Sequence, residues 1–158
     1  MYFPKNILEI GTCLGITTAH LAARNKQAKI LTLEGNHARA QQALNLFKEI
    51  GISNIQLQVG EFSTALPRLL NDYGQLDVVF IDGNHRRAPT LEYFGMLRNH
   101  LHEDSIVIID DIRWSEEMNQ TWRILAADEA VQTSIELFDM GILFFRKDLF
   151  RRHFYLRG

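Results

Sequence analysis

Short apolar runs that alternate with amphipathic segments constrain the fold of this chain more than any other feature. The short runs are rich in residues that favour strands, and the segments between them carry apolar residues near helical spacing. A strand–helix alternation of this kind predicts a parallel sheet with helices on both faces. The predicted strands lie at 7–10, 29–34, 55–59, 76–82 and 105–111, and the predicted helices at 15–25, 36–50, 61–72, 86–100 and 114–128.

Two of the runs, VVFID at 78–82 and IVIID at 106–110, are apolar almost without alternation. Central parallel strands have this composition because helices cover both of their faces. The last part of the chain departs from the strand–helix order, since strand-like runs at 133–138 and 142–146 meet around Asp139-Met140-Gly141. This pattern predicts a terminal antiparallel hairpin. We therefore expect an α/β fold built on a doubly wound, Rossmann-like sheet of seven strands.

Length and composition narrow the class of protein. The chain has 158 residues, three prolines and no linker-like stretch, which indicates a single domain over 1–158. Its 17 lysines and arginines nearly balance 19 aspartates and glutamates, so bulk charge does not indicate a nucleic-acid or membrane partner. The single cysteine excludes an intrachain disulfide and fits a cytoplasmic protein. We see no cationic leader and no apolar stretch near the roughly 18 residues of a spanning helix.

A turn with two glycines follows the first predicted strand, in the run Glu9-Ile10-Gly11-Thr12-Cys13-Leu14-Gly15. Glycine permits positive φ and lets a ligand approach the backbone closely. The dinucleotide fingerprint would need glycines where this chain has Cys13 and Ile16, and no Gly-Lys-Ser/Thr follows for a P-loop. The turn is therefore a candidate cofactor site, and the alternative is a tight strand-to-helix turn that binds nothing.

Acidic residues follow the second and third predicted strands. Glu34 lies about 20 residues beyond the glycine turn, where a carboxylate is placed to accept hydrogen bonds from both ribose hydroxyls of an adenosine. Glu61, which follows Gly60, or the backbone beside it is placed to contact the adenine edge. The alternatives are a solvated helix-capping carboxylate for Glu34 and an N-terminal helix residue for Glu61.

Together these segments resemble those of the class I S-adenosylmethionine-dependent methyltransferases. EIGTCLG is similar to the first motif of that superfamily, LTLEG to the second and QVGEF to the adenine-side loop. Within the superfamily, the pattern is most similar to the small-molecule O-methyltransferases that include the catechol and caffeoyl-CoA enzymes. The resemblance runs from Ile7 to Lys147 and implies S-adenosylmethionine as the cofactor. The cofactor-binding residues that it implies are Glu9, Gly11, Thr12, Cys13, Gly15, Glu34, Gly35, Gly60, Glu61 and Asp82.

Three aspartates, Asp82, Asp110 and Asp111, end the fourth and fifth predicted strands. If those strands are neighbours, the carboxylates converge at the rim where open α/β sheets bind ligands. Converging carboxylates repel unless a proton or a cation bridges them, and an all-oxygen cluster suits Mg²⁺, Mn²⁺ or Ca²⁺. The alternative is that Asp82 contacts only the cofactor or solvent and that the other two aspartates cap the next helix.

The resemblance sharpens this metal assignment. Metal-dependent O-methyltransferases have an aspartate after the fourth strand, then an Asp-Asn pair with a tryptophan three residues beyond the Asn. The residues at those positions are Asp82, Asp110, Asp111 and Trp114, so that an aspartate replaces the usual Asn. His85 stands where those enzymes carry a lysine, and it is placed to accept the proton of a substrate hydroxyl. The catalytic candidates are therefore His85 and Asp82, and the alternative for His85 is a surface position.

These observations predict transfer of a methyl group from S-adenosylmethionine to a hydroxyl of a small-molecule acceptor, assisted by a divalent cation. The rival functions are a metal-free methyltransferase that acts on another atom and a cofactor-binding module without catalysis. Related enzymes precede the first strand with helices that cover the site, and a strand that begins at Ile7 leaves no room for them in this sequence. We therefore expect either that the chain is a truncated domain or that another subunit supplies the cover. Apolar surface left exposed in this way predicts a homodimer or a weakly soluble monomer.

Overall fold

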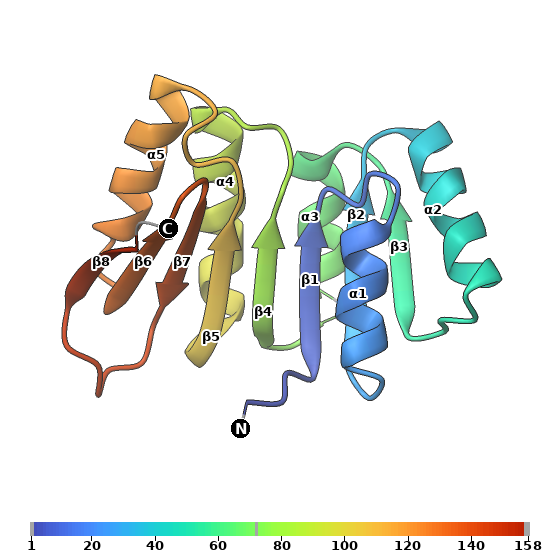
Figure 1. Cartoon of the computed structure of the whole chain (residues 1–158), viewed down its shortest axis with the longest axis horizontal. Coiled ribbons are helices and arrows are strands. Elements are labelled where there is room, and N and C mark those ends of the chain that lie inside the picture. Colours follow the sequence, from blue (N-terminus) through green and yellow to red (C-terminus); the bar gives the residue numbers. More distant parts are fainter. Residues whose placement is uncertain (1, 72, 157–158) are drawn as a thin grey trace.

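The computed structural model describes residues 2–71 and 73–156, and it centres on one sheet of eight strands in the order β3-β2-β1-β4-β5-β7-β6-β8 (Figure 1). The strands are β1 Asn6–Ile10, β2 Lys29–Glu34, β3 Ile55–Val59, β4 Leu76–Ile81, β5 Leu101–Ile109, β6 Thr133–Leu137, β7 Met140–Phe144 and β8 Arg152–Leu156. The helices are α1 Ile16–Arg24, α2 His37–Glu49, α3 Phe62–Asn71, α4 Arg87–Leu97 and α5 Glu116–Ala126, with a 3₁₀ turn, η1, at Arg98–His100.

The first five strands are parallel, and the strand order reverses at β1, which pairs with β2 on one side and β4 on the other. The register places Ile7 between Ile30 and Val78. β7 is antiparallel to both β5 and β6. Ligands of open α/β sheets bind outside the carboxyl ends of the strands at such a reversal, so the topology places a crevice between the loops after β1 and β4. The predicted doubly wound α/β fold is confirmed.

Both faces of the central strands are buried, as their unbroken apolar runs predict. In β1, Ile7 points to one face and Leu8 to the other, and both are fully buried. Ile7 packs with residues of α1 and β2, whereas Leu8 belongs to a larger cluster that includes Leu66 of α3, Tyr93 of α4 and Trp122 of α5. α1 and α2 therefore cover one face of the sheet, and α3, α4 and α5 cover the other.

The C-terminal hairpin differs in register from the predicted one. Gly141 was expected in the turn, but it lies inside β7, and the turn is formed by Phe138 and Asp139. A Cβ at position 141 would lie 2.4 Å from Cζ3 of Trp122, so a glycine is required there because the indole fills the space. Phe138 instead adopts the left-handed backbone of the turn, with φ of +45°.

β8 adds an eighth strand to the seven that were predicted. It pairs in parallel with β6, and all of its residues are exposed. Its sequence, Arg-His-Phe-Tyr-Leu, lacks the alternation of a half-buried strand, which is why the pattern indicated only a solvated edge. The predicted end of the third helix, residue 72, lies outside the described residues, as do 1, 157 and 158. Among the residues that the structure does describe, no helix is long and apolar enough to cross a membrane.

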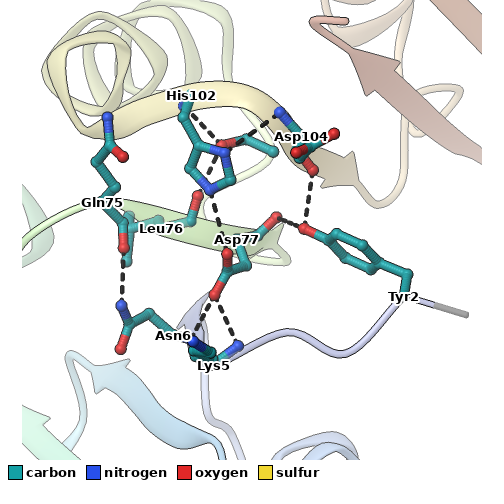
Figure 2. A network of polar contacts seen from close by, with 9 residues as sticks. Tyr2, Lys5, Asn6, Gln75, Leu76, Asp77, His102 and Asp104 are labelled. Carbon is teal, nitrogen blue, oxygen red and sulfur yellow. Dashed lines mark hydrogen bonds and ion pairs between the residues drawn. The ribbon is translucent and has the colours of Figure 1, made fainter.

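The segment before β1 is tied to the amino ends of β4 and β5 (Figure 2). Asp77 Oδ2 accepts the backbone N–H groups of Lys5 (2.7 Å) and Asn6 (2.8 Å). The Tyr2 hydroxyl lies 2.9 Å and 2.8 Å from the carbonyl oxygens of Asp77 and Asp104 and is shared between them. Burial, with the charges of Asp77 and Asp104, raises the pKa of Tyr2 to about 12, so this hydroxyl stays a donor at physiological pH.

Candidate functional site

The glycine turn after β1 is shaped by close contacts within the protein. A Cβ on Gly11, whose φ is +109°, would lie 2.0 Å from the carbonyl oxygen of Asp82. A Cβ on Gly15, whose φ is +83°, would lie 2.6 Å from the ring of Phe47 in α2. Gly11 therefore allows the loops after β1 and β4 to touch, and Gly15 allows α1 to pack on α2. This packing leaves the backbone of the turn at the crevice between β1 and β4.

The carboxylate of Glu34, at the end of β2, is buried and fixed against this turn. Its Oε2 accepts the backbone N–H of Cys13 (2.7 Å), and its Oε1 accepts the N–H of Asn36 (2.8 Å). Asn36, rather than Glu34, caps α2, since the Asn36 side chain accepts from the first helical N–H groups. Each carboxylate oxygen keeps a second lone pair, so Glu34 remains able to accept from two further donors.

Glu9 lies beneath the turn and is completely buried. Its Oε2 accepts hydrogen bonds from the hydroxyls of Thr18 and Thr32, while Oε1 has no partner among the described residues. Burial raises the pKa of Glu9, the two hydroxyls oppose that effect, and the charge of Asp82 adds to it. No sequence motif indicates either threonine. Thr32, however, lies within the apolar run of β2, and a threonine in such a run is a signal for a buried polar contact.

Glu61 directly precedes α3, and its carbonyl oxygen accepts the N–H groups of Thr64 (3.1 Å) and Ala65 (2.8 Å). Its carboxylate accepts from the hydroxyls of Ser63 and Thr64, and these bonds lower its pKa. The main chain at Gly60 donates to the carbonyl of Glu34 (3.0 Å), and a Cβ on Gly35 would meet the Gly60 carbonyl at 3.9 Å. The loops after β2 and β3 therefore lie side by side next to the glycine turn.

Asp82, His85 and Asp111 form a cluster at the carboxyl ends of β4 and β5. One ligand atom from each of the three lies within 4.8 Å of the others. His85 Nε2 is 3.5 Å from Asp111 Oδ2 and 3.8 Å from Asp82 Oδ1. The three side chains are half-buried, so the cluster is open to a ligand. Because carboxylate oxygens and a neutral imidazole nitrogen both bind divalent metals, the donor set fits a cation.

Asp110 lies beside this cluster. Its Oδ1 accepts the backbone N–H of Asp111 (3.0 Å). Burial, followed by the charge of Asp110 and more weakly that of Asp111, raises the pKa of Asp82 to about 6, while His85 opposes the shift. The cluster thus contains two of the three aspartates predicted as metal ligands, together with the histidine predicted as the base. Asp111 has a left-handed backbone, with φ of +55°, which no sequence pattern indicates.

Aromatic side chains flank the cluster. Trp114 is 70% exposed, and its ring centroid lies 5.9 Å from that of His85. On the α4 side, the Asn84 amide donates to the hydroxyl of Tyr93 (3.1 Å), and the Tyr93 ring meets that of Phe62 edge to face. The sequence motifs indicate Trp114. They do not indicate Asn84, Phe62 or Tyr93, because the roles of these three residues depend on contacts between separate elements. Trp114 therefore presents an exposed apolar surface next to the cluster.

Comparison with known proteins identifies this arrangement. Residues 8–112 match the profile of a methyltransferase domain family, and they run from within β1 to just beyond β5. The chain belongs to this methyltransferase family. The methyltransferase domain is also 31% identical over 111 residues to a catechol O-methyltransferase from Niastella koreensis, a match that covers 68% of this chain and 49% of the relative. The chain spans about half the length of the curated relatives that it matches.

Solved structures share the fold of this methyltransferase domain. The O-methyltransferase TomG from Streptomyces achromogenes, in complex with S-adenosylmethionine, superposes with a TM-score of 0.79 at 22% identity, over 91% of this chain and 74% of that one. An O-methyltransferase from Bacillus cereus, in complex with S-adenosylhomocysteine, superposes with a TM-score of 0.74 at 20% identity, over 89% of this chain and 74% of that one.

Proposed function

We propose that this methyltransferase domain binds S-adenosylmethionine and transfers its methyl group to a hydroxyl oxygen of a small molecule. The observation that carries the proposal is the placement of two groups on either side of one crevice. The fixed carboxylate of Glu34 lies beside the glycine turn, and the cluster of Asp82, His85 and Asp111 lies after β4 and β5. The name of the Niastella relative supports a catechol-like acceptor.

The cofactor would lie over the turn from Gly11 to Gly15. Glu34 would accept hydrogen bonds from the ribose hydroxyls through its remaining lone pairs. Glu9 keeps an unpartnered oxygen beneath the turn, and Asp82 adds negative charge beside it. This negative environment suits a ligand that carries an ammonium and a sulfonium group. Thr12, Cys13, Gly35, Gly60 and Glu61 line or support the same turn and its neighbouring loops.

The acceptor would lie beside the Asp82 cluster. A divalent cation bound there would lower the pKa of the acceptor hydroxyl. The residues that would hold it are Asp82 and Asp111, with Asp110 or His85 beside them. His85 Nε2 would accept the hydroxyl proton when it is not a ligand, and Trp114 would orient a planar acceptor. The oxygen–methyl bond forms as the sulfonium–methyl bond breaks, and S-adenosylhomocysteine leaves.

The test is transfer of a labelled methyl group from S-adenosylmethionine to catechols and related hydroxylated acceptors, with Mg²⁺, Mn²⁺ or a chelator. We expect cation-dependent turnover that Asp111→Ala abolishes while binding of S-adenosylhomocysteine is nearly unchanged. His85→Ala should lower the rate by about 10²–10⁴-fold if His85 is the base. Full activity in excess chelator would favour a metal-free methyltransferase, and tight cofactor binding without transfer to any acceptor would favour a binding module.

A further inference from the structure

A second cleft lies at the end of the sheet that is far from the crevice. Residues at the C-terminal end of α5 and in β6 and β8 line a cavity of about 390 Å³. Figure 1 shows these elements at one end of the sheet. Its position at the start of β8 and the end of α5 places it toward the amino ends of the parallel strands, opposite the methyl-transfer site. A cavity of this size falls within the range of small-molecule pockets in proteins. The residues that line the cavity include Arg123, Val131, Arg151, Arg152, His153 and Tyr155.

The exposed strand β8 is held in place over this cleft by specific bonds. The backbone N–H of Arg152 donates to the carbonyl of Gln132 (3.0 Å), and the hydroxyl of Thr133 donates to the carbonyl of Phe150 (3.0 Å). His153 Nδ1 shares a hydrogen bond with the hydroxyl of Ser134, a buried residue of β6. The wall that β8 contributes is therefore ordered before any ligand arrives.

Three guanidinium groups border the cleft without a carboxylate partner. Within 2–71 and 73–156, no Asp or Glu lies at ion-pair distance from Arg123, Arg151 or Arg152, and no acidic residue lines the cavity. The Arg151 guanidinium donates to the carbonyl oxygens of Ala127 (2.8 Å) and Asp128 (3.3 Å), which fix its position. The Asp128 carboxylate is engaged by Arg98 at 3.3 Å. Among the described residues, the three guanidinium groups therefore place positive charge beside the cleft without a carboxylate partner. Arg152 also lies 5.3 Å from the centre of the Phe150 ring, and His153 Nε2 lies 3.7 Å from Glu136 Oε2.

The remaining lining suits the uncharged part of a ligand. Ala126, Ala127 and Val131 form an apolar floor, and Val131 is buried. The rings of His153 and Tyr155 meet edge to face with centroids 4.4 Å apart on the β8 side. Guanidinium groups bind phosphate oxygens through paired hydrogen bonds, and such charge-assisted bonds are stronger than neutral ones.

We propose that this cleft binds a phosphate group, either free phosphate or the phosphate of a small organic molecule whose body contacts the apolar floor. The site is separate from the methyl-transfer crevice and does not depend on the function proposed for it. Nucleic acid is the competing ligand for a basic strand with interleaved aromatic residues. The cleft is an open hollow of about 390 Å³, bounded on one side by the ordered strand β8. This limited size favours a small anion, because nucleic acid requires an extended groove or platform.

The test is calorimetry at low ionic strength with three probes: inorganic phosphate, phenyl phosphate and benzoate. Arg123→Ala and Arg152→Ala are the test variants, and Arg24→Ala, in α1 on another part of the surface, is the matched control. We avoid Arg151 because its bonds to the end of α5 also support the fold. We expect 1:1 binding of a phosphate probe that is weakened about tenfold or more in each test variant and unchanged in the control. Tighter binding of phenyl phosphate than of inorganic phosphate identifies an organic phosphate as the ligand.

A fluorescence titration provides a second, local measurement. Trp122 and Trp114 are the two tryptophans of the chain, and Trp122 lies 6.0 Å from the His153 ring. In a Trp114→Phe background, the phosphate probes should change the emission of Trp122. The proposal is overturned if neither phosphate probe binds at about tenfold above the millimolar concentrations at which weak anion sites bind. It is also overturned if the Arg24→Ala control weakens binding as much as the test variants do. Tighter binding of a single-stranded oligonucleotide than of phenyl phosphate overturns it as well.

Discussion

Three carboxylates around the crevice have different surroundings, which give them different chemical properties. Glu34 accepts two backbone N–H groups, so its orientation is fixed. Glu9 is buried with one oxygen unpartnered, and burial raises its pKa. Asp82 has a pKa of about 6 because burial and the neighbouring charge of Asp110 disfavour its ionised form. A fixed hydrogen-bond acceptor and two carboxyl groups whose ionised forms are disfavoured thus lie around one crevice.

Glu34→Ala should weaken the binding of S-adenosylhomocysteine by at least about tenfold, since a pair of charge-assisted hydrogen bonds to the ribose would be lost. Isothermal calorimetry measures the change. Glu49→Ala, at the end of α2, is the control and should bind normally. A melting curve for each variant separates lost binding from lost folding, because Glu34 also supports the N–H groups of Cys13 and Asn36. Unchanged affinity in folded Glu34→Ala protein would refute this placement of the cofactor.

Asp82→Asn should raise the melting temperature at pH 7 in buffer that contains a chelator. The folded-state pKa of about 6 lies above the ordinary value of 3.8, so the folded protein binds more protons than the unfolded chain between these values. The contribution of Asp82 to stability is therefore fully present below pH 3.8 and is lost as the pH rises through 6. Asn removes this loss, so the melting temperatures at pH 5 and pH 7 should differ less than in the wild type. A lower melting temperature for the variant at pH 7 contradicts the expectation.

At the scale of single elements, the hairpin of β6 and β7 shows how packing decides the register. Trp122 of α5 is buried, and its Nε1 donates to Glu136 Oε2 (3.0 Å), so the indole is held over β7. Arg113 also donates to Glu136, at 2.6 Å from Oε1. Burial alone would raise the pKa of Glu136, but the hydrogen bonds from Arg113 and Trp122 outweigh it and lower the pKa. This network connects the hairpin to the loop after β5, which carries Asp111.

Gly141→Ala should destabilise the protein by about 1–3 kcal/mol, because the added methyl group would overpack against the Trp122 ring. Urea unfolding measures the loss. Gly95→Ala is the matched control: a Cβ there meets nothing within 4 Å, and the residue lies inside α4. The control should gain about 0.5–1 kcal/mol, since alanine favours a helix over glycine. Equal effects of the two substitutions would show that the indole does not set the register.

The sequence predicts those elements whose residues carry a pattern and misses those that depend on contacts. The apolar runs at 78–81 and 106–109 predict the central parts of β4 and β5, because burial on both faces favours apolar residues there. β8 has no such pattern, since its backbone pairs with β6 while its side chains remain in solvent. The same distinction holds at the site: Asp82 and Asp111 are predicted from strand ends. The place of His85 in the cluster depends on left-handed residues at Asn84 and Asp111.

At the scale of the whole molecule, the strand order brings the two halves of the site together. β1 and β4 are neighbours in the sheet although 65 residues, 11–75, lie between them in the sequence, so the glycine turn and the Asp82 loop face each other across the reversal. The same edge of the sheet carries four exposed large apolar side chains. Large side chains that follow β1, β5 and β6 are exposed there, with Phe138 the most exposed at 75%. The four are Leu14, Ile16, Trp114 and Phe138.

We expect the protein to form a homodimer that covers this apolar edge, because contiguous exposed apolar surface favours association. Light scattering across a concentration series should give the mass of two chains. Ile16→Lys, on the exposed side of α1, should shift the protein toward the monomer, whereas Ile124→Lys, an exposed isoleucine of α5, should not. A well-behaved monomer at high concentration would count against the dimer.

The anchoring of Tyr2 and Lys5 to Asp77 has a practical consequence for attaching the protein to a solid support (Figure 2). A linker joined ahead of Tyr2 leaves the molecule at the amino ends of the strands, on the side opposite the crevice. Protein captured on a sensor chip through such a linker would present the cofactor turn to the flowing solution. Surface-based binding measurements should therefore give the same affinities for S-adenosylhomocysteine as measurements in free solution.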